Sequence, residues 1–573
     1  MTGYWRRIAL SALLIAGLVV GIRYARRPAL DRQAPPARTG GSLVATLRGE
    51  PSTFNRYASQ GFPTHLVSLL TQGRLVRINR RTDVAEPWLA DAWSVSADGR
   101  SITLDLRRDV TWADGAPFDA DDVVFSFKAA YDQRAGSVLA GALRVGGQPI
   151  AVRKDGSHRI VLTFTEPYAP GVRLLEALPI YPRHLLEGAL ATGTFAKAWG
   201  LTTPPWQMTG LGPFVLEKYE PGQRLVFARN LRYWRHDPAG VHLPYLDRIT
   251  LEIVPDQNAE LLRLTSGQVD LVQAELRPED YRPVKAAADA GQVRLYDAGP
   301  GLDRQVLWFN LGHPDPSRAF LAEDGFREAV SLAVDRRAFA DAVFLGAAEP
   351  APFAVPPANS HWLPEGLEPP PFDPARAAAL LDGIGLRRTD PAAPRTDAAG
   401  RAVRFSILVQ AGITPAEKGA AFIRDALATI GVGVDVVSVD FGSVMGRWGQ
   451  GQYDAIYQLL VPTDTDPAAN LDWWLSHGGG HVWNPGQPQP ATPWEAEIDR
   501  LMTRQASTLD ASERRALFTE VERLVLAHNP VIYFAAPRVY VATSTRVAPL
   551  TPAVSRPQVL WAADEIRQAD GTP

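Results

Sequence analysis

The spacing that comes nearest to a metal-binding pattern in this sequence is the pair His477 and His481, with three glycines between them. Histidines four positions apart on a helix face the same side and can hold one metal ion. Glycine, however, disfavours a helix by about 1 kcal/mol per residue relative to alanine. Without a helix, the spacing of four residues no longer indicates a metal site, and the sequence predicts a flexible loop here with no metal.

Acidic and glycine-rich clusters offer two further chemistries. Asp119, Asp121 and Asp122 could supply oxygen ligands to Ca²⁺, but the rest of a calcium-binding loop is missing. Their place before an apolar segment predicts a helix N-cap with an acidic first turn. The glycine pairs at 210–212 and 431–433 lack the third glycine of a phosphate-binding loop.

Catalytic signatures are missing from the rest of the sequence. It contains no serine-hydrolase elbow, no Walker A loop and no zinc-protease helix motif. Cysteine is absent, which excludes disulfides, zinc–thiolate sites, iron–sulfur clusters, cysteine nucleophiles and a lipidated N-terminal cysteine. We therefore expect a protein that is not an enzyme and that carries no metal and no cofactor.

Length and charge bound the class of protein. The chain has 573 residues, which predicts two to four lobes around large cores. Its formal charge is -3, but residues 1–40 carry seven arginines against one acidic residue. The remaining chain is therefore mildly acidic, at about -9, whereas a nucleic-acid-binding protein needs a basic face. We expect no nucleic-acid partner.

The N-terminus reads as a targeting segment. An apolar run at 8–22 is flanked by Arg6 and Arg7 on one side and by further arginines on the other. As a helix it spans about 22 Å, short of the roughly 30 Å hydrocarbon core of a membrane. Residues 1–27 are thus either a cleaved signal peptide or an N-terminal membrane anchor, and 28–40 form a proline-rich linker. The body is expected to be exported.

Strand and helix patterns alternate along the body, which favours an α/β protein. Irregular stretches at 350–371 and 462–494 are long enough to suggest a functional role. The expected strands are 43–47, 101–110, 158–164, 249–256, 268–272 and 531–535, with a hairpin at 213–228; the expected helices are 119–132, 257–267, 372–385 and 513–530, and 415–440 reads as a helix followed by a strand.

Specific strings then resemble a known family. Residues 89–128 resemble the signature of family 5 extracellular solute-binding proteins, the peptide, nickel and oligopeptide receptors of ABC importers. Five further blocks agree in order, and the resemblance runs from about 41 to 545. The positions in register within the first string are Trp93, Asp98, Gly99, Leu106, Arg107, Val110, Asp114, Gly115, Pro117, Ala120, Asp122 and Val123; the further blocks are 209–234, 262–272, 306–336, 372–385 and 453–474.

The resemblance implies a bilobed periplasmic-binding-protein fold of type II, an α/β architecture with discontinuous lobes joined by hinge strands. Ligand would bind in the cleft, and hinge closure would bury it. The crossing strands are expected near Val306–Leu311 and Val531–Phe534. The implied division is lobe I at 41–80, 208–304 and 532–573, an inserted subdomain at 81–207, and lobe II at 305–531.

The same resemblance implies a set of ligand-binding residues. In peptide receptors of this family an aspartate of the late Asp-Pro segment pairs with the ligand ammonium, and Thr463 stands at that position here. Asp464, one residue along, is a candidate replacement. The neutral strip from Gln458 to Thr463 favours a less cationic, capped or cyclic ligand, and a free peptide N-terminus stays open as the alternative.

Aromatic and polar residues complete the expected cleft. Phe54, Asn55 and Tyr57 follow the first strand, where this family often lines the cleft. Trp473 lies near the predicted cleft edge and could stack on a ligand, with core packing as the alternative. The candidate set is therefore Phe54, Asn55, Tyr57, Gln458, Thr463, Asp464 and Trp473.

These expectations combine into a function. We expect the extracytoplasmic, monomeric solute-binding component of an ABC importer, which binds a peptide or similar small solute and docks on an inner-membrane permease. The alternative is an envelope sensor or chaperone-like protein that reuses the fold and is tethered to the membrane by residues 8–22. A fold resemblance alone does not decide between them.

Overall fold

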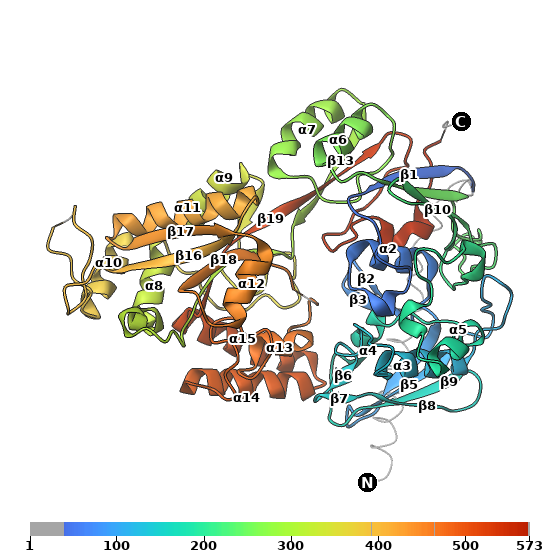
Figure 1. Ribbon diagram of the computed structural model, residues 1–573, viewed down its shortest axis with the longest axis horizontal. Coiled ribbons are helices and arrows are strands. Elements are labelled where there is room, and N and C mark those ends of the chain that lie inside the picture. Colours follow the sequence, from blue (N-terminus) through green and yellow to red (C-terminus); the bar gives the residue numbers. More distant parts are fainter. Residues whose placement is uncertain (1–38, 391, 463, 571–573) are drawn as a thin grey trace, which may run out of the picture.

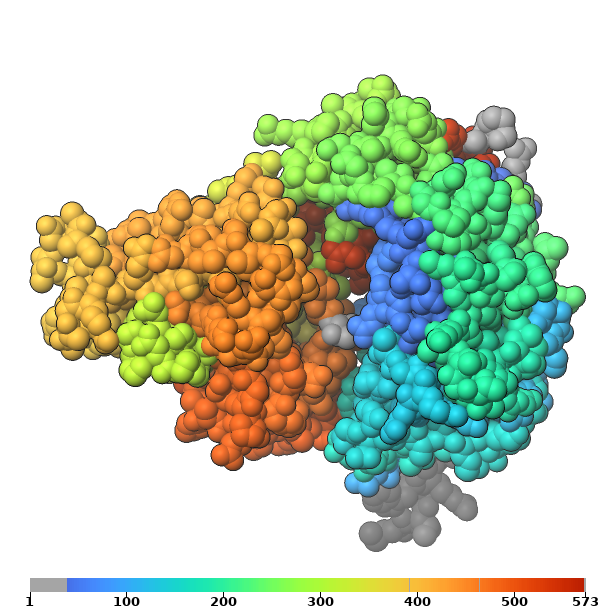
Figure 2. All heavy atoms as spheres, in the orientation of Figure 1, coloured from blue at the N-terminus to red at the C-terminus, as the bar shows by residue number. Residues whose placement is uncertain are grey.

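A computed structural model describes residues 39–390, 392–462 and 464–570 of the chain. The predicted signal or anchor segment 1–27, nearly all of the linker 28–40, and Thr463 lie outside these described residues. Within them, no helix is both long enough and apolar enough to cross a membrane. Two bodies are separated by a hollow, with the last long strand passing between them (Figures 1 and 2).

We propose the predicted division as the lobe boundaries and keep its names. Lobe I is 41–80, 208–304 and 532–573, the inserted subdomain is 81–207, and lobe II is 305–531. In Figure 1 lobe II, in yellow and orange, lies on the left, and the blue and teal parts of lobe I and of the inserted subdomain lie on the right.

Lobe I is built on a four-stranded sheet in the order β1 (Ser42–Leu47), β12 (Arg248–Ile253), β11 (Arg224–Arg229) and β10 (Phe214–Glu220). β1 runs parallel to β12, and the other neighbours are antiparallel. The hairpin predicted at 213–228 is confirmed, and Gly222 in its turn has the positive φ of 70° that favours glycine. Helix α2 (Phe62–Thr71) and the hairpin β2 (Val76–Asn79) and β3 (Val84–Pro87) lie beside this sheet.

The inserted subdomain adds an antiparallel sheet and two helices. The sheet order is β4 (Ala90–Val95), β5 (Ser101–Leu106), β9 (Arg159–Thr163) and β8 (Ala151–Lys154), and the helices are α3 (Ala120–Tyr131) and α5 (Arg183–Ala191). The predicted N-cap is confirmed, because the Asp119 carboxylate accepts the amide of Asp121 at 2.8 Å. One continuous apolar core joins this subdomain to the lobe I sheet.

A longer sheet links the lobes. Its order is β13 (Val293–Pro300), β19 (Val531–Ser544), β14 (Arg304–Phe309), β18 (Ala455–Leu460), β16 (Arg404–Gln410) and β17 (Gly433–Val439), with β15 (Ala348–Pro350) beside β19. The first half of β19 pairs with β14, and its second half pairs with β13 of lobe I. β19 is therefore a continuous strand that crosses between the lobes, as Figure 1 shows.

Lobe II buries both faces of this sheet. Because side chains alternate along a strand, Leu307 and Phe309 of β14 enter one core while Val306 and Trp308 enter the other. One core contains α8 (Asp324–Ala333), α9 (Arg336–Phe344), α10 (Pro374–Gly383) and α11 (Thr414–Thr429); the other contains α12 (Phe441–Gly449), α13 (Leu471–Trp474), α14 (Pro493–Ser507) and α15 (Ala511–His528).

Shorter elements connect these layers. In lobe I, α6 (Gln257–Thr265) and α7 (Tyr281–Asp289) pack around β13 and β19 in a small separate core. The remaining elements are η1 (Arg56–Ala58), β6 (Arg144–Val145), β7 (Gln148–Pro149), α4 (Gly171–Leu174), η2 (Leu175–Ala177), η3 (Phe195–Lys197), η4 (Pro205–Gln207), η5 (Pro278–Asp280), η6 (Pro316–Ala322), η7 (Pro467–Asn470) and η8 (Leu560–Glu565).

The predicted helices are confirmed as α3, α6, α10, α11 and α15, but the strand predicted at 268–272 is wrong. Leu271 alone forms bridges, one to Ala45 and one to Thr543. The segment passes between β1 and β19, and the Asp270 carboxylate accepts the amide of Val44 at 2.9 Å. Because only Leu271 forms a bridge to each neighbouring strand, the segment does not form a ladder.

Candidate functional site

The interlobe hollow, visible in Figure 2, is closed at one end by an arginine. Arg173 of α4 donates from Nε to Oδ1 of Asp464 at 2.9 Å and from Nη1 to the carbonyl of Asp83 at 2.8 Å. Its Nη2 donates to Oδ1 of Asp83 at 2.8 Å and to Oγ1 of Thr465 at 2.7 Å. Thr465 in turn donates to Oδ2 of Asp83 at 2.7 Å. We call these four residues the latch.

Two further hydrogen bonds join the inserted subdomain to lobe II at the same end. The amide of Ala169 donates to the carbonyl of Ala506 at 2.7 Å. The hydroxyl of Tyr168 donates to the carbonyl of Ala468 at 3.4 Å. The inserted subdomain and lobe II are therefore in direct contact beneath the hollow.

The opposite end is the hinge. Arg538 of β19 pairs with Asp297 of β13 at 2.8 Å and with Glu349 of β15. Arg556, in the C-terminal part of lobe I, pairs with Asp303 at 2.8 Å and with Glu275. These ion pairs tie the crossing strands to both lobes, so that the lobes meet at both ends and leave space between them.

Two buried charged residues lie close together where β14 begins. Arg304 is 7% exposed, and its guanidinium lies over the ring of Tyr533 at 5.7 Å. Glu522 of α15 is fully buried and accepts the amides of Ala354 at 3.1 Å and Val355 at 2.9 Å. Burial raises the pKa of Glu522 to about 7, although both amides and the charge of Arg304 oppose the rise.

The three candidates that follow the first strand lie inside lobe I. Asn55 accepts the amide of Tyr57 at 3.0 Å and donates to the carbonyl of Phe195 at 2.8 Å. The Tyr57 hydroxyl donates to the carbonyl of Pro179 at 2.9 Å, and Phe54 packs edge-on against Tyr219. All three are buried, and their contacts are made within the lobe I and inserted-subdomain core. Their role as ligand contacts stays a prediction.

The candidates of lobe II lie nearer the hollow. Gln458 is half-buried on β18, opposite Val306. Asp464 belongs to the latch, and its Oδ1 also accepts the amide of Asp466 at 2.8 Å. Burial raises the pKa of the Asp464 carboxyl, and the charge of Arg173 opposes this rise. Trp473 is half-buried, with its ring edge-on to Trp483.

His477 and His481 do not face a common site. His481 is buried, with Nε2 at 3.0 Å from Nε2 of Gln487, whereas His477 is exposed. Glu495 caps α14 and accepts the indole N–H of Trp483 at 3.1 Å. Burial raises its pKa, but hydrogen bonds from His481 and other neighbours outweigh this and lower it to about 2. Among the described residues no group of side chains is arranged to hold a metal ion.

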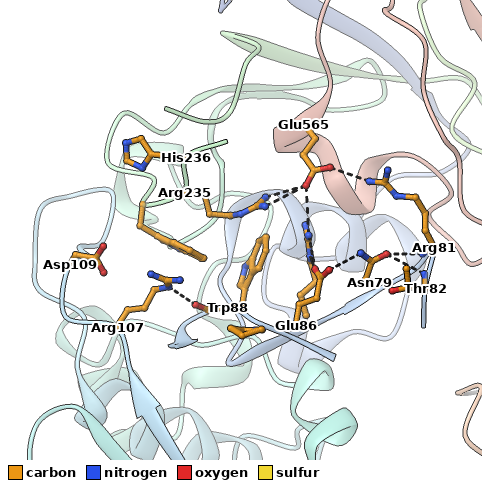
Figure 3. Close-up of a pocket in the computed structure, with 13 residues that line it drawn as sticks. Asn79, Arg81, Thr82, Glu86, Trp88, Arg107, Asp109, Arg235, His236 and Glu565 are labelled. Carbon is orange, nitrogen blue, oxygen red and sulfur yellow. Dashed lines mark hydrogen bonds and ion pairs between the residues drawn. The ribbon is translucent and has the colours of Figure 1, made fainter. Parts of the chain in front are cut away.

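A second cavity, of about 810 Å³, lies within lobe I and the inserted subdomain (Figure 3). Arg77 and Arg235 stack on the ring of Trp88, at 4.0 and 4.4 Å from its centroid, and Arg107 stacks on Trp234 at 4.2 Å. These arginines also have acidic partners, namely Glu86 and Glu565 for Arg77, Asp564 and Glu565 for Arg235, and Asp91 for Arg107. None of these residues was predicted to bind a ligand, although Arg107 lies in register with the family signature. Because its charges are matched internally, this cavity is a weaker candidate site than the interlobe hollow.

Comparison with known sequences agrees with the architecture. The model of bacterial extracellular solute-binding proteins, family 5 middle, matches residues 84–481. A probable ABC transporter-binding protein of Deinococcus radiodurans is 27% identical over 535 residues, which cover 89% of each chain. A dipeptide-binding protein of Pseudomonas aeruginosa is 25% identical over 562 residues, covering 94% of this chain and 96% of that protein.

Solved structures share the fold. NikA from Brucella suis, in complex with Fe(III)-EDTA, superposes with a TM-score of 0.77 at 21% identity, covering 92% of this chain and all of that one. AppA from Bacillus subtilis, in complex with a nonapeptide, gives a TM-score of 0.69 at 19% identity, covering 93% of this chain and all of that one. The fold is thus the bilobed α/β fold of type II periplasmic binding proteins, and the chain belongs to family 5 of the bacterial extracellular solute-binding proteins.

Proposed function

We propose that this chain captures a peptide or a peptide-like small solute in the interlobe hollow and presents it to the permease of an ABC importer. Proteins of this family are solute-binding receptors of ABC importers and have no catalytic activity of their own. The observation that carries the proposal is the hollow itself, bounded by the latch at one end and by the crossing strands at the other. A cavity enclosed from two lobes can replace the water around a solute with fixed hydrogen bonds.

The latch supports a mechanism of closure. Arg173 comes from the inserted subdomain, whereas Asp464 and Thr465 come from lobe II, so their hydrogen bonds exist only when the lobes approach. Hydrogen bonds between charged groups contribute roughly 1.5–3 kcal/mol each. A bound solute that fills the hollow would favour this closed arrangement by shifting the population of states.

The hydrogen bonds of Asp464 affect which solute charge the hollow can attract. Its Oδ1 already accepts hydrogen bonds from Arg173 and from the amide of Asp466. A carboxylate compensated in this way has less attraction for a ligand ammonium than a free one. The geometry therefore supports a solute whose recognition does not depend on an amino terminus at Asp464.

Location and oligomeric state complete the proposal. Members of the family are periplasmic or otherwise extracytoplasmic, and we propose the same location for this chain. Residues 8–22 would serve as a signal peptide or as an inner-membrane anchor, and the receptor would act as a monomer.

The direct test is to identify what the protein carries. Residues 41–573 are purified, bound small molecules are released and identified by mass spectrometry, and thermal unfolding is followed with di- and tripeptides, nickel salts, opines and sugars. A solute at about 100 times its dissociation constant is expected to add roughly 2.7 kcal/mol to the free energy of unfolding.

The outcomes separate the candidate functions. A co-purifying peptide, or a peptide that shifts the unfolding temperature, supports the proposal. If no solute co-purifies and none of the tested classes changes the unfolding temperature, the transport function is contradicted, and the membrane-tethered sensor or chaperone becomes the better hypothesis.

A further inference from the structure

Arg304 is a buried cation whose guanidinium has no polar partner in the part of the chain that the structure describes. It is 7% exposed, and its Nε is fully buried with no hydrogen bond. The guanidinium of Arg304 forms neither a hydrogen bond nor an ion pair with any residue in the described ranges. Its contact with the face of Tyr533, at 5.7 Å, orients the guanidinium but supplies no acceptor.

Other buried arginines among the described residues have polar partners, and even Arg77, whose Nη1 has none, forms an ion pair with Glu86 at 2.8 Å. Arg336 donates to the carbonyls of Tyr533 and Ser331 and to the Ser331 hydroxyl, at 2.8, 3.2 and 2.9 Å. Arg514 forms a two-pronged ion pair with Asp466, at 2.9 and 2.6 Å. Buried guanidinium groups are normally paired or hydrogen-bonded, because leaving one without partners carries a large free-energy cost. Arg304 is therefore an exception that requires an explanation.

The nearby acids do not supply one. Asp303 is engaged by Arg556 at 2.8 Å. Glu522 accepts two backbone amides, and burial raises its pKa to about 7, so that its negative charge is only partly present at neutral pH. The described residues thus supply no acceptor for the Arg304 guanidinium, and its donors are available to a bound group.

The position of Arg304 gives that group access from the hollow. Arg304 opens β14 and lies opposite Leu460, the last residue of β18. Beyond Leu460, Val461 is exposed, and a few residues later Asp464 accepts the hydrogen bond from Arg173 of the inserted subdomain. The end of the sheet that carries Arg304 therefore faces the space between hinge and latch.

We propose that Arg304 binds a carboxylate of the transported solute, which makes the solute an acidic or zwitterionic small molecule such as a peptide with a free C-terminus. The planar guanidinium fork matches a carboxylate with two parallel hydrogen bonds. One cation between Asp303 and Glu522 suits a single negative charge better than a doubly charged phosphate. This inference rests on the proposed function, because it assigns a group of the solute bound in the hollow.

The test compares acids with their amides. The probes are a mixed library of di- and tripeptides with free C-terminal carboxylates and the same library as C-terminal carboxamides. Binding to both is measured by thermal unfolding and by competition for the wild-type protein, Arg304→Gln and the control Arg404→Gln. Arg404 is exposed and pairs with Asp435 on the outer strands of the lobe II sheet, remote from the hinge strands.

The wild type and Arg404→Gln are expected to prefer the acid library at least tenfold, and Arg304→Gln is expected to lose that preference. Because the substitution removes an uncompensated buried charge, ligand-free Arg304→Gln should unfold at the same temperature as the wild type or higher. This second readout distinguishes a binding role from a structural one.

Each other outcome overturns the inference. If the wild type binds acids and amides equally well, Arg304 does not hold a carboxylate, while the proposed function stands. If Arg304→Gln fails to fold, or unfolds well below Arg404→Gln without ligand, Arg304 is a structural residue. If the wild type binds neither library, the peptide-binding proposal fails and this inference falls with it.

Discussion

Glu522 is a single buried carboxyl group whose ionisation should affect the stability of the whole fold. In the unfolded chain it titrates near its ordinary pKa of 4.5, and in the native state burial raises the pKa to about 7. The native state therefore holds the proton more tightly between these two values. The free energy of unfolding contributed by Glu522 is highest at low pH and falls as pH rises from about 4.5 to about 7, by roughly 3 kcal/mol in all.

The prediction is tested with Glu522→Gln, which cannot ionise. We expect urea unfolding of the wild type to show a loss of stability between pH 5 and pH 8 that Glu522→Gln lacks. Glu520→Gln serves as control, because Glu520 is exposed and pairs with Arg523 on the same helix. Parallel pH profiles for the wild type and Glu522→Gln would mean that Glu522 titrates normally in the folded protein.

The roles of individual residues could be predicted where their hydrogen-bond partners are close in the sequence. The cap formed by Asp119 involves residues two and three positions along, so the spacing alone predicted it. The role of Arg304 depends on which distant groups fail to reach it, and among so many arginines no local signal separates it from the satisfied Arg336. The latch was likewise missed except for Asp464, because Asp83 and Arg173 are far from it in the sequence.

Helices and strands were predictable where the hydrophobic periodicity agreed with the residues that start or end an element. α15 was predicted from its apolar spacing and from Pro530 at its end. Segment 268–272 has the alternation of a strand but lies between two strands, to each of which only Leu271 forms a bridge. Gly210 is a further example, since an added Cβ would lie 1.8 Å from the carbonyl oxygen of Thr71. A glycine is needed here because the two backbone segments pack closely, and a search for phosphate-loop motifs does not reveal this.

The latch joins α4 and the β2–β3 turn to the segment that follows β18 in lobe II, so its hydrogen bonds connect elements on opposite sides of the hollow. Arg173→Gln removes the hydrogen bonds to Asp464 and Asp83 and leaves two carboxylates facing each other across the lobes. We expect the affinity for the co-purifying solute to fall about 5- to 150-fold, corresponding to a closed state weakened by 1–3 kcal/mol. Unfolding of the ligand-free protein should change little, because the open state hydrates these charges.

Isothermal titration of stripped protein measures this effect. The control is Arg134→Gln, which removes an exposed pair with Asp132 on the same inserted subdomain. Equal affinities for Arg173→Gln and the control would show that the latch contacts do not contribute to closure.

At the scale of the whole molecule, the lobes are joined by strands rather than by a flexible linker. The crossing near Val531–Phe534 was anticipated, but β19 continues to Ser544 and pairs with β13 in lobe I. The shared core of lobe I and the inserted subdomain makes these two a single packing unit. Closure must therefore take place as a rotation of lobe II against that unit, with little change inside either.

This architecture predicts a change in one interlobe distance and no change within a lobe. Because the chain has no cysteine, spin labels can be placed uniquely at Gln133→Cys in the inserted subdomain and Thr503→Cys in lobe II, both exposed. Pulsed electron–electron distance measurements should give a broad distribution without solute. Saturating solute, the molecule that co-purifies with the protein, should narrow this distance distribution and shift it to shorter distances, because binding favours the closed state.

A second pair within lobe II, Arg424→Cys with Thr503→Cys, should give the same distance distribution with and without solute. If the interlobe distribution is already narrow and does not respond to solute, the lobes form a rigid body and the hollow is not filled by hinge closure.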